Sequence, residues 1–289
     1  MSISTSVCGL SMGQREVSLT TRRMLAYAAG IGDLSPCVFD DLDPGFMAHP
    51  AFCVALEWPL LSEPGIAAQL LSDPRDAARA VHLTQDSHFH RPLRALERLT
   101  TRGAVTGVWR GAAGARVAST LSTFGADGVP AVTSHLVAVY RGVEAVGPDR
   151  PADESPEVPR AQELEGAMQQ TEIAIEPALA HRYTECSGIW NPIHTERRVA
   201  RAMGLPDRVL HGTATWAMAG TQIVQRLAAG DASRLRRLHG RFGALVFPGC
   251  SISLQWRTRP LGEQTEVFFS VLTPDGTPAI ADGYALLAP

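Results

Sequence analysis

The residues with the clearest capacity for chemistry lie within one stretch, 183–194, which reads Tyr-Thr-Glu-Cys-Ser-Gly-Ile-Trp-Asn-Pro-Ile-His. Proline restricts the residue before it, so Asn191-Pro192 should end a preceding helix and hold Asn191 in an extended or turn conformation. His194 follows two residues later, beside Ile193. A histidine fixed on such a loop beside apolar residues can have a near-neutral pKa and act as a general base. The alternative is a histidine that only hydrogen-bonds its own loop.

A second stretch, Leu205 to Gly212, ends in His211-Gly212 at the predicted start of a helix. A glycine there leaves its N–H unpaired and sterically open. Such an N–H, aided by the helix dipole, can hold a carbonyl oxygen as negative charge develops on it. The alternative is a small residue at a close helix–sheet contact. Arg208, just before this point, is a candidate for contacting a phosphate, because arginine binds phosphates well.

The elements that must position these residues occur twice. Each half ends with an Asp-Gly-x-Pro-Ala turn between two apolar runs, at 127–131 and at 275–279. Asp-Gly between strand-like runs predicts a β-hairpin, and two such hairpins half a chain apart suggest duplication. Between the halves, residues 144–165 are rich in proline and charge and read as an exposed linker. We therefore predict domains at 1–143 and 166–289.

The two halves also begin alike. Helices are expected over 20–32 and 177–188, and each is followed by a histidine at the head of an apolar stretch, His49 and His211. Residues 211–229 have helical spacing and almost no polar face, so this helix should be buried against a sheet. Each half then reads as helix, irregular loop, buried helix and antiparallel strands. That order belongs to the α+β class, with a sheet curled around one helix.

Composition narrows the classes of function. The chain has 289 residues and a net charge of -3, with no basic stripe, so neither nucleic acid nor a membrane surface is an expected partner. Its five cysteines form no CxxC pair, and neither a metal site nor a glycine-rich nucleotide loop is visible, so we expect no cofactor. Neither a signal peptide nor a membrane-spanning apolar run is evident, which favours a cytoplasmic location.

Residues 183–212 resemble the signature of the MaoC-type (R)-specific enoyl-CoA hydratases, Gly-Asp-x-Asn-Pro-x-His followed by a helix and Ile/Val-x-His-Gly. The corresponding residues are Gly188 to His194 and Val209 to Gly212. The resemblance implies a double hot-dog fold, in which each of two fused domains wraps an antiparallel sheet around a long helix. It also implies reversible hydration of a trans-2-enoyl thioester of CoA or acyl carrier protein. The sequence leaves a homodimer of such chains as an open expectation.

By matching position, the resemblance makes His194 the acid/base, the Gly212 N–H the oxyanion donor and Asn191 a brace for the loop. Substrate contacts are then expected from the remaining motif residues and their neighbours, namely Ile189, Trp190, Pro192, Arg208 and His211. The family's catalytic Asp falls on Ile189, and in the N-terminal half Asp33 is present while Val38 takes the His position. Glu185 and Glu196 are the nearest carboxylates in sequence, and a dyad of Asp33 with His194 across the two halves is a further alternative.

The altered motif leaves three interpretations of function. The first is a hydratase or dehydratase in which His194 acts alone or with a relocated carboxylate. The second is a thioester enzyme that needs one base, such as an isomerase, cyclase or thioesterase. The third is a non-catalytic thioester-binding protein. The apolar pair Ile189-Trp190 favours a dry site.

Overall fold

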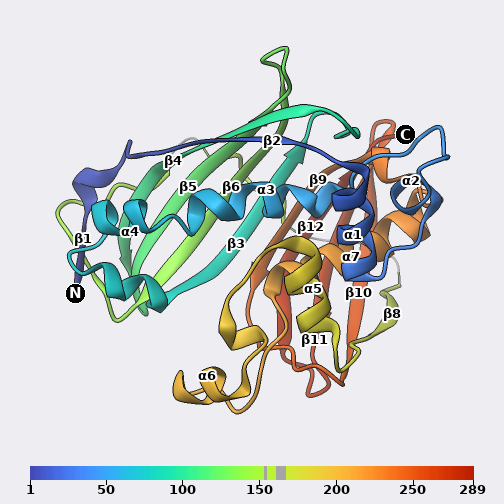
Figure 1. The fold of residues 1–289 in the computed structure, drawn as a ribbon. Helices are drawn as coiled ribbons and strands as arrows, with labels where there is room; N and C mark the ends of the chain where they lie inside the picture. Colours follow the sequence, from blue (N-terminus) through green and yellow to red (C-terminus); the bar gives the residue numbers. More distant parts are fainter. Residues whose placement is uncertain (153–154, 161–166) are drawn as a thin grey trace. The chain divides into compact units, whose positions relative to one another are not determined.

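A computed structural model of the protein describes residues 1–152, 155–160 and 167–289 (Figure 1). These residues form two compact units that alternate along the chain. Unit 1 comprises Met1–Ser18, Leu56–His90 and Arg98–Val158, and unit 2 comprises Leu19–Ala55, Arg91–Glu97 and Pro159–Pro289. The first helical segment of the N-terminal half thus belongs to the same unit as the C-terminal motif. The predicted boundaries after 143 and before 166 stay a prediction.

Unit 1 is built on an antiparallel sheet. Among its described residues the strand order is β2-β4-β5-β6-β3, and a separate short pair, β1 with β7, runs parallel. The predicted hairpin at 127–131 is confirmed: Gly128 has φ +75°, and Gly125 N–H donates to Val129 O at 3.1 Å. The strands are β1 (Ser2–Ser4), β2 (Ser11–Ser18), β3 (Ala80–Phe89), β4 (Arg98–Gly111), β5 (Gly114–Phe124), β6 (Pro130–Arg141) and β7 (Glu144–Val146).

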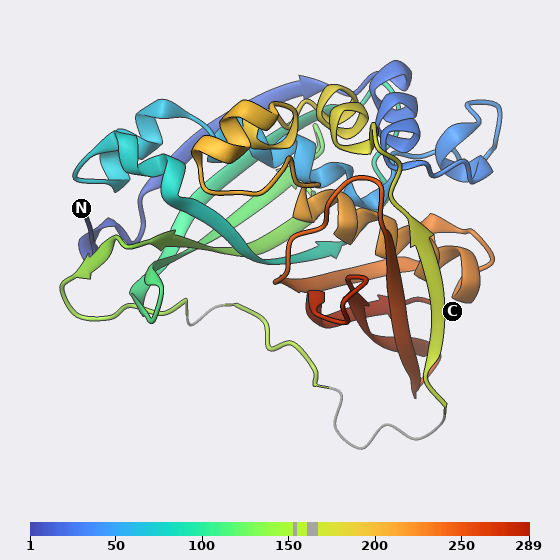
Figure 2. The ribbon, with the colours of Figure 1, turned by 90° about the horizontal axis from the view of Figure 1, so that it is seen from below.

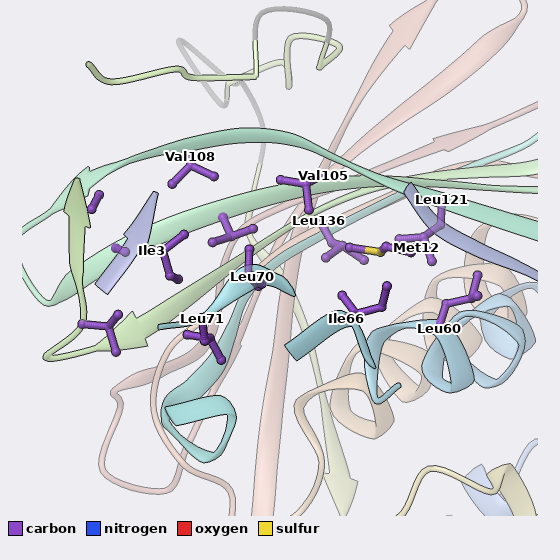
Figure 3. Close-up of a cluster of buried hydrophobic side chains, with 14 residues drawn as sticks. Ile3, Met12, Leu60, Ile66, Leu70, Leu71, Val105, Val108, Leu121 and Leu136 are labelled. Atoms are coloured by element: carbon purple, nitrogen blue, oxygen red, sulfur yellow. The ribbon is translucent and has the colours of Figure 1, made fainter. Parts of the chain in front are cut away.

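The core of unit 1 lies between this sheet and two short helices (Figure 3). α3 (Cys53–Leu61) and α4 (Pro64–Leu70) contribute Leu60, Ile66 and Leu70, which pack on residues of the sheet such as Val105 and Leu136. The resemblance implied one long helix here, but the helix is broken. Pro64 is the first residue of α4 and Glu63 before it is extended, because proline disfavours helical backbone at the preceding residue. Short 3₁₀ turns lie at Thr5–Val7 and Pro74–Arg79.

The predicted linker begins with structure of its own. Its first residues form β7, and Arg150 exchanges two backbone hydrogen bonds with Val108, at 2.7 and 2.8 Å. Residues 147–151 are exposed, as expected of a linker. Residues 153–154 and 161–165 of the predicted linker lie outside the described residues.

Unit 2 contains the second antiparallel sheet, with strand order β9-β12-β11-β10-β8 among its described residues. The second predicted hairpin is also confirmed, with Gly276 at φ +81° and Thr273 N–H donating to Thr277 O at 3.0 Å. The strands are β8 (Gln169–Ala174), β9 (Leu235–Phe242), β10 (Ser251–Leu261), β11 (Gln264–Leu272) and β12 (Pro278–Leu287). The helices are α1 (Thr21–Ile31), α2 (Pro36–Phe39), α5 (Leu179–Ser187), α6 (Arg197–Ala202) and α7 (Gly212–Leu227). Single 3₁₀ turns lie at Pro50–Phe52, Pro192–His194 and Ala232–Arg234.

α7 is the predicted buried helix, and it lies against the sheet of unit 2 (Figures 1 and 2). Glycines set how closely it packs on β9. A Cβ on Gly220 would lie 2.8 Å from Leu238, and one on Gly212 would lie 2.9 Å from the ring of Phe242. Between them Trp216 is fully buried beneath Gly240. Four residues of a helix and two residues of a strand both span about 6 Å. Every fourth residue of α7 therefore meets every second residue of β9.

Two amphipathic helices of unit 2, α1 and α5, lie side by side (Figures 1 and 2). A Cβ on Gly30 would come within 2.7 Å of Cys186 Cβ, so a glycine is needed for this close approach. Both helices end at a left-handed glycine, Gly32 with φ +76° and Gly188 with φ +73°. These ends confirm the helices predicted over 20–32 and 177–188. They also place the two copies of the repeated loop at equivalent points, directly after paired helices.

Candidate active site

The loop after α5 is held by its own polar side chains. Ile189 N–H donates to Ser187 Oγ at 3.1 Å, and Ile193 N–H donates to Asn191 Oδ1 at 3.2 Å. Asn191 is extended, with φ −147° and ψ 125°, as the following Pro192 requires. Asn191 therefore caps the 3₁₀ turn Pro192–His194, and this contact supports the role of loop brace expected for it.

His194 is the last residue of that turn, and one of its ring nitrogens is engaged. Nδ1 lies 2.8 Å from Val209 O. A carbonyl oxygen only accepts, so the proton resides on Nδ1 and Nε2 keeps its lone pair. Burial lowers the pKa of His194 to about 4, partly offset by the bond to Val209. The expectation of a near-neutral pKa is therefore wrong: His194 is uncharged at neutral pH and is a weaker base than an exposed histidine.

His211 stacks directly on His194, with ring centroids 3.5 Å apart and an interplanar angle of 24°. Its Nε2–H donates to Ile189 O at 3.1 Å, which fixes the ring against the loop that precedes His194. Burial, and then the neighbouring His194, lower the pKa of His211 well below its ordinary value. The two stacked imidazoles are thus both neutral, so they pack without charge repulsion. Asn191, His194 and His211 are brought together as a single assembly.

Gly212 follows His211 as the first residue of α7. It is exposed, and among the described residues no acceptor contacts its N–H. The start of a helix concentrates positive partial charge, and no side chain from the described ranges caps this one. Gly212 therefore has both features considered from the sequence. Its N–H is open, and the absence of a side chain allows the close contact with Phe242.

The remaining predicted substrate residues divide into two groups. Ile189 is buried, whereas Trp190 is 58% exposed, so the two do not form the dry apolar pair expected from sequence. Arg208 is partly buried, with Nη1 3.5 Å from His181 Nε2 and Nε 3.6 Å from Asp207, so its charge is partly neutralised within its own loop.

The carboxylates considered as substitutes for the missing Asp lie elsewhere. Glu185 and Glu196 are exposed. Asp33 is buried, and its oxygens accept from Ser35, at 2.6 Å from its hydroxyl, and from Thr221, at 3.2 Å. None of the contacts among the described residues joins Asp33 to His194. The dyad across the two halves therefore has no support in the contacts of either residue.

The sequence did not reveal a chain of hydroxyls beside the stacked histidines. The ring of Tyr183 packs edge-on against His211, with centroids 4.9 Å apart, and its hydroxyl donates to Thr213 Oγ1 at 3.1 Å. Tyr27, from α1, places its hydroxyl 3.5 Å from that of Tyr183. A signal was present: Tyr27 and Tyr183 each precede the motif position occupied by Asp33 and Ile189 by six residues.

Both halves of the chain are similar to known dehydratase regions. Residues 159–262 match the model of the MaoC like domain, and residues 6–133 match that of the FAS1-like dehydratase domain region. The 3-hydroxyacyl-thioester dehydratase Y of Mycobacterium tuberculosis is 29% identical over 254 residues, covering 83% of each chain. Other relatives, named as enoyl-CoA hydratases or as a multifunctional enzyme, include longer proteins of which the chain spans about half or less.

Solved structures agree on the fold. The MaoC-like dehydratase of Phytophthora capsici superposes with a TM-score of 0.81 at 21% identity, covering 96% of this chain and 95% of that one. A conserved hypothetical protein of M. tuberculosis, described as having a double hot-dog fold, gives 0.62 at 15% identity over 96% and 95%. The α+β double hot-dog class is therefore confirmed. The chain contains a MaoC-like region in its C-terminal half and a FAS1-like dehydratase region in its N-terminal half.

Within the part of the chain that the structure describes, no three His, Cys, Asp or Glu side chains gather in a way that could hold a metal ion. Over the same residues, no helix has both the length and the apolar character required to cross a bilayer.

Proposed function

We propose that this protein interconverts 3-hydroxyacyl and trans-2-enoyl thioesters, with His194 as the single acid/base and the Gly212 N–H as a donor to the thioester oxygen. The observation that carries the proposal is the stacked assembly. His194 keeps the lone pair of Nε2, which contacts no donor in the described part of the chain, and it packs on His211, the residue that directly precedes Gly212 and its open N–H. The names of the relatives support the same substrate class.

One neutral base is sufficient for the dehydration direction. His194 Nε2 takes the proton from C2, and the electron pair of the broken C–H bond moves onto the thioester oxygen, where the Gly212 N–H stabilises it. The electrons then return to form the C2–C3 double bond. The C3–O bond breaks, and the leaving hydroxide takes the proton from His194, which gives water. Hydration is the reverse of these steps, and no charge is left on the protein.

A second candidate is an isomerase that moves a double bond within an enoyl thioester. It is favoured by one specific observation: among the described residues no carboxylate contacts His194, and Ile189 occupies the motif position that would orient a water. Isomerisation needs a proton to leave one carbon and return to another, which one base achieves without water.

The partner is either CoA or acyl carrier protein as carrier of the acyl group, because both present the same pantetheine arm. Trp190, Pro192 and Arg208 are proposed to line the approach to His194 and Gly212, with Trp190 as the exposed apolar contact. A cytoplasmic location and a homodimer of double hot-dog chains complete the proposal.

The test is turnover of a panel of 2-enoyl- and 3-hydroxyacyl-CoA thioesters, with solvent deuterium incorporation at C2 and C4 followed by mass spectrometry. Hydration and dehydration change the mass by one water, whereas isomerisation does not. We expect His194→Ala to lower kcat at least about a hundredfold, the scale for loss of a general base, with the fold intact by circular dichroism. Activity unchanged in this variant would contradict the assignment.

The matched control is Asp33→Asn, which alters the carboxylate that stands at the family's Asp position in the other half. Its contacts with Ser35 and Thr221 are structural, so kcat should stay within about threefold of the starting protein. A loss comparable to that of His194→Ala would instead restore the alternative of a dyad across the two halves.

A further inference from the structure

In the first turn of α7, the residue that directly follows Gly212 carries a hydroxyl. Thr213 is half-buried, and its Oγ1 accepts a hydrogen bond from the Tyr183 hydroxyl at 3.1 Å. A hydroxyl has one proton and two lone pairs, so accepting this bond leaves its own proton available for donation. Among the described residues no acceptor contacts the Thr213 hydroxyl as donor.

The direction of the bond between Tyr183 and Thr213 follows from a third residue. Tyr27 donates its proton to Ala51 O at 2.8 Å and lies 3.5 Å from the Tyr183 hydroxyl. The proton of Tyr183 therefore has two neighbouring oxygens, of which Thr213 Oγ1 is the nearer by 0.4 Å. Tyr183 is fully buried, and burial raises its pKa to about 12, so it keeps that proton throughout the physiological range.

A hydroxyl that accepts one hydrogen bond is polarised and becomes a stronger donor. The same arrangement restricts rotation of the Thr213 side chain, so its proton is directed away from Tyr183 before substrate arrives. Pre-oriented donors stabilise developing charge most effectively, because they need not reorganise during the reaction. Gly212 alone supplies one such donor, whereas an oxyanion on a thioester has room for two.

We infer that the Thr213 hydroxyl is the second donor to the thioester oxygen, acting beside the Gly212 N–H, and that Tyr183 is the residue that positions it. The inference rests on the proposed function and deepens it. In the dehydration step described above, the electron pair that reaches the thioester oxygen when His194 removes the C2 proton is then held by two hydrogen bonds. Neither Thr213 nor Tyr183 gains or loses a proton.

Three variants test the inference by steady-state kinetics with trans-2-butenoyl-CoA. Thr213→Val keeps the shape and removes the hydroxyl, and kcat should fall about tenfold to a hundredfold with a smaller change in KM. Thr213→Ser keeps the hydroxyl and should recover most of the rate. Tyr183→Phe should cost less, about threefold to tenfold, and should add little when combined with Thr213→Val, because both changes act on one hydroxyl.

Thr215→Val is the matched control on the same helix. The Thr215 hydroxyl is buried and has no hydrogen-bond partner among the residues that the structure describes, so its removal should leave kcat unchanged and should not lower the melting temperature. If Thr213→Val and Thr215→Val behave alike, the inference is overturned.

Infrared difference spectroscopy of bound trans-2-butenoyl-CoA adds a readout that a purely structural role would not move. Each donor to the thioester oxygen lowers the carbonyl stretching frequency. Thr213→Val should lose part of this downshift, whereas Thr213→Ser and Thr215→Val should keep it. An unchanged frequency in Thr213→Val, with normal binding, would show that its hydroxyl does not contact the oxygen.

The two proposals fail in different ways. If the unaltered protein turns over no enoyl or 3-hydroxyacyl thioester in the panel, the proposed function fails. If it does, but Thr213→Val retains the full rate and the full carbonyl shift, only the role of Thr213 and Tyr183 fails.

Discussion

Unit 2 contains both copies of one loop, and the two copies share a backbone conformation but differ in the side chains that could act on a substrate. Each copy begins at a left-handed glycine that ends a helix, and each closes at a histidine that begins the next helical segment. His49 has φ −52° and ψ 134°, and His211 has φ −59° and ψ 134°. The backbone of the motif is therefore the same in both copies at these points.

The two copies differ in how their side chains are engaged. Both ring nitrogens of His49 are used within the protein: Nδ1 accepts from Ala51 N–H at 3.1 Å, and Nε2 lies 3.0 Å from Thr221 Oγ1. The next residue is Pro50, which has no N–H to offer, whereas His211 is followed by Gly212. Val38 stands where the other copy has His194. The histidine of the N-terminal copy thus braces α7 through Thr221, whereas the C-terminal copy carries His194 and a Gly212 N–H that no described residue accepts from.

The largest expected effect comes from placing a proline at position 212, where the N-terminal copy has Pro50. Gly212→Pro removes the N–H at a helix position that proline tolerates well. Loss of one oxyanion donor should lower kcat about a hundredfold to a thousandfold. The measurement is single-turnover dehydration of a 3-hydroxyacyl-CoA, so that binding and chemistry are separated.

Gly212→Ala is the control for that change, because it keeps the N–H but adds a Cβ that would lie 2.9 Å from the Phe242 ring. Its loss reports the steric cost that Gly212→Pro shares. Equal losses in the two variants would mean that packing on Phe242, and not the N–H, explains the requirement for glycine.

Much of this arrangement was predictable from periodic pattern and turn chemistry. The Asp-Gly hairpins, the buried helix after His211 and the glycine ends of α1 and α5 are local features that short stretches of sequence encode. The break between α3 and α4 was missed, although Pro64 was a visible local signal. The roles expected of His194, His211 and Asn191 came from the resemblance to the family signature, and the stacking of the two histidine rings was not predicted.

Other features depend on contacts between distant parts of the chain, which a linear pattern does not contain. The pKa of His194 is set by burial beneath groups that tertiary packing brings to it, and so was predicted wrongly. The exposure of Trp190 depends on the direction in which its side chain leaves the loop after α5. Thr213 carried no signal of its own, since its contact with Tyr183 joins residues 30 positions apart.

The comparison is sharpened by moving the carboxylate of the N-terminal copy into the other. Ile189→Asp should raise the hydration rate about tenfold if the new carboxylate faces the site, because a base that orients water contributes on at least that scale. Ile189 is buried, so the melting temperature should fall, in keeping with a desolvation cost of about 1–3 kcal/mol for a carboxylate with fewer donors than Asp33.

Two other outcomes of Ile189→Asp carry equally clear meanings. A fall in both hydration rate and stability would favour the isomerase, in which a charge near His194 is harmful. No change in either property would show that the side chain at position 189 does not face the site.

The smallest expected effect is a pH dependence of stability, which His194 contributes and Val38 in the other copy does not. The pKa of His194 is lowered to about 4 from an ordinary value of 6.5, so between these values the unfolded chain binds the proton and the folded protein does not. The contribution of neutral His194 to stability is therefore complete above about pH 6.5 and is lost as the pH falls towards 4. His194→Asn should make the free energy of unfolding, measured in urea from pH 7.5 to 4.5, fall less steeply across this window.

The rate of dehydration should follow the same pKa and stay flat from pH 7.5 to about 5, because His194 is already the free base. His49 titrates in both proteins and provides the shared background, since its pKa is lowered as well, whereas the pKa of His211 should rise in His194→Asn because His194 is one cause of its lowering. A rate that instead declined around pH 6.5 would mean that His194 is more hydrated than its contacts indicate. Replacement of His194 by Val38 in the other copy would then be the main difference between the two loops, and a difference in burial would not.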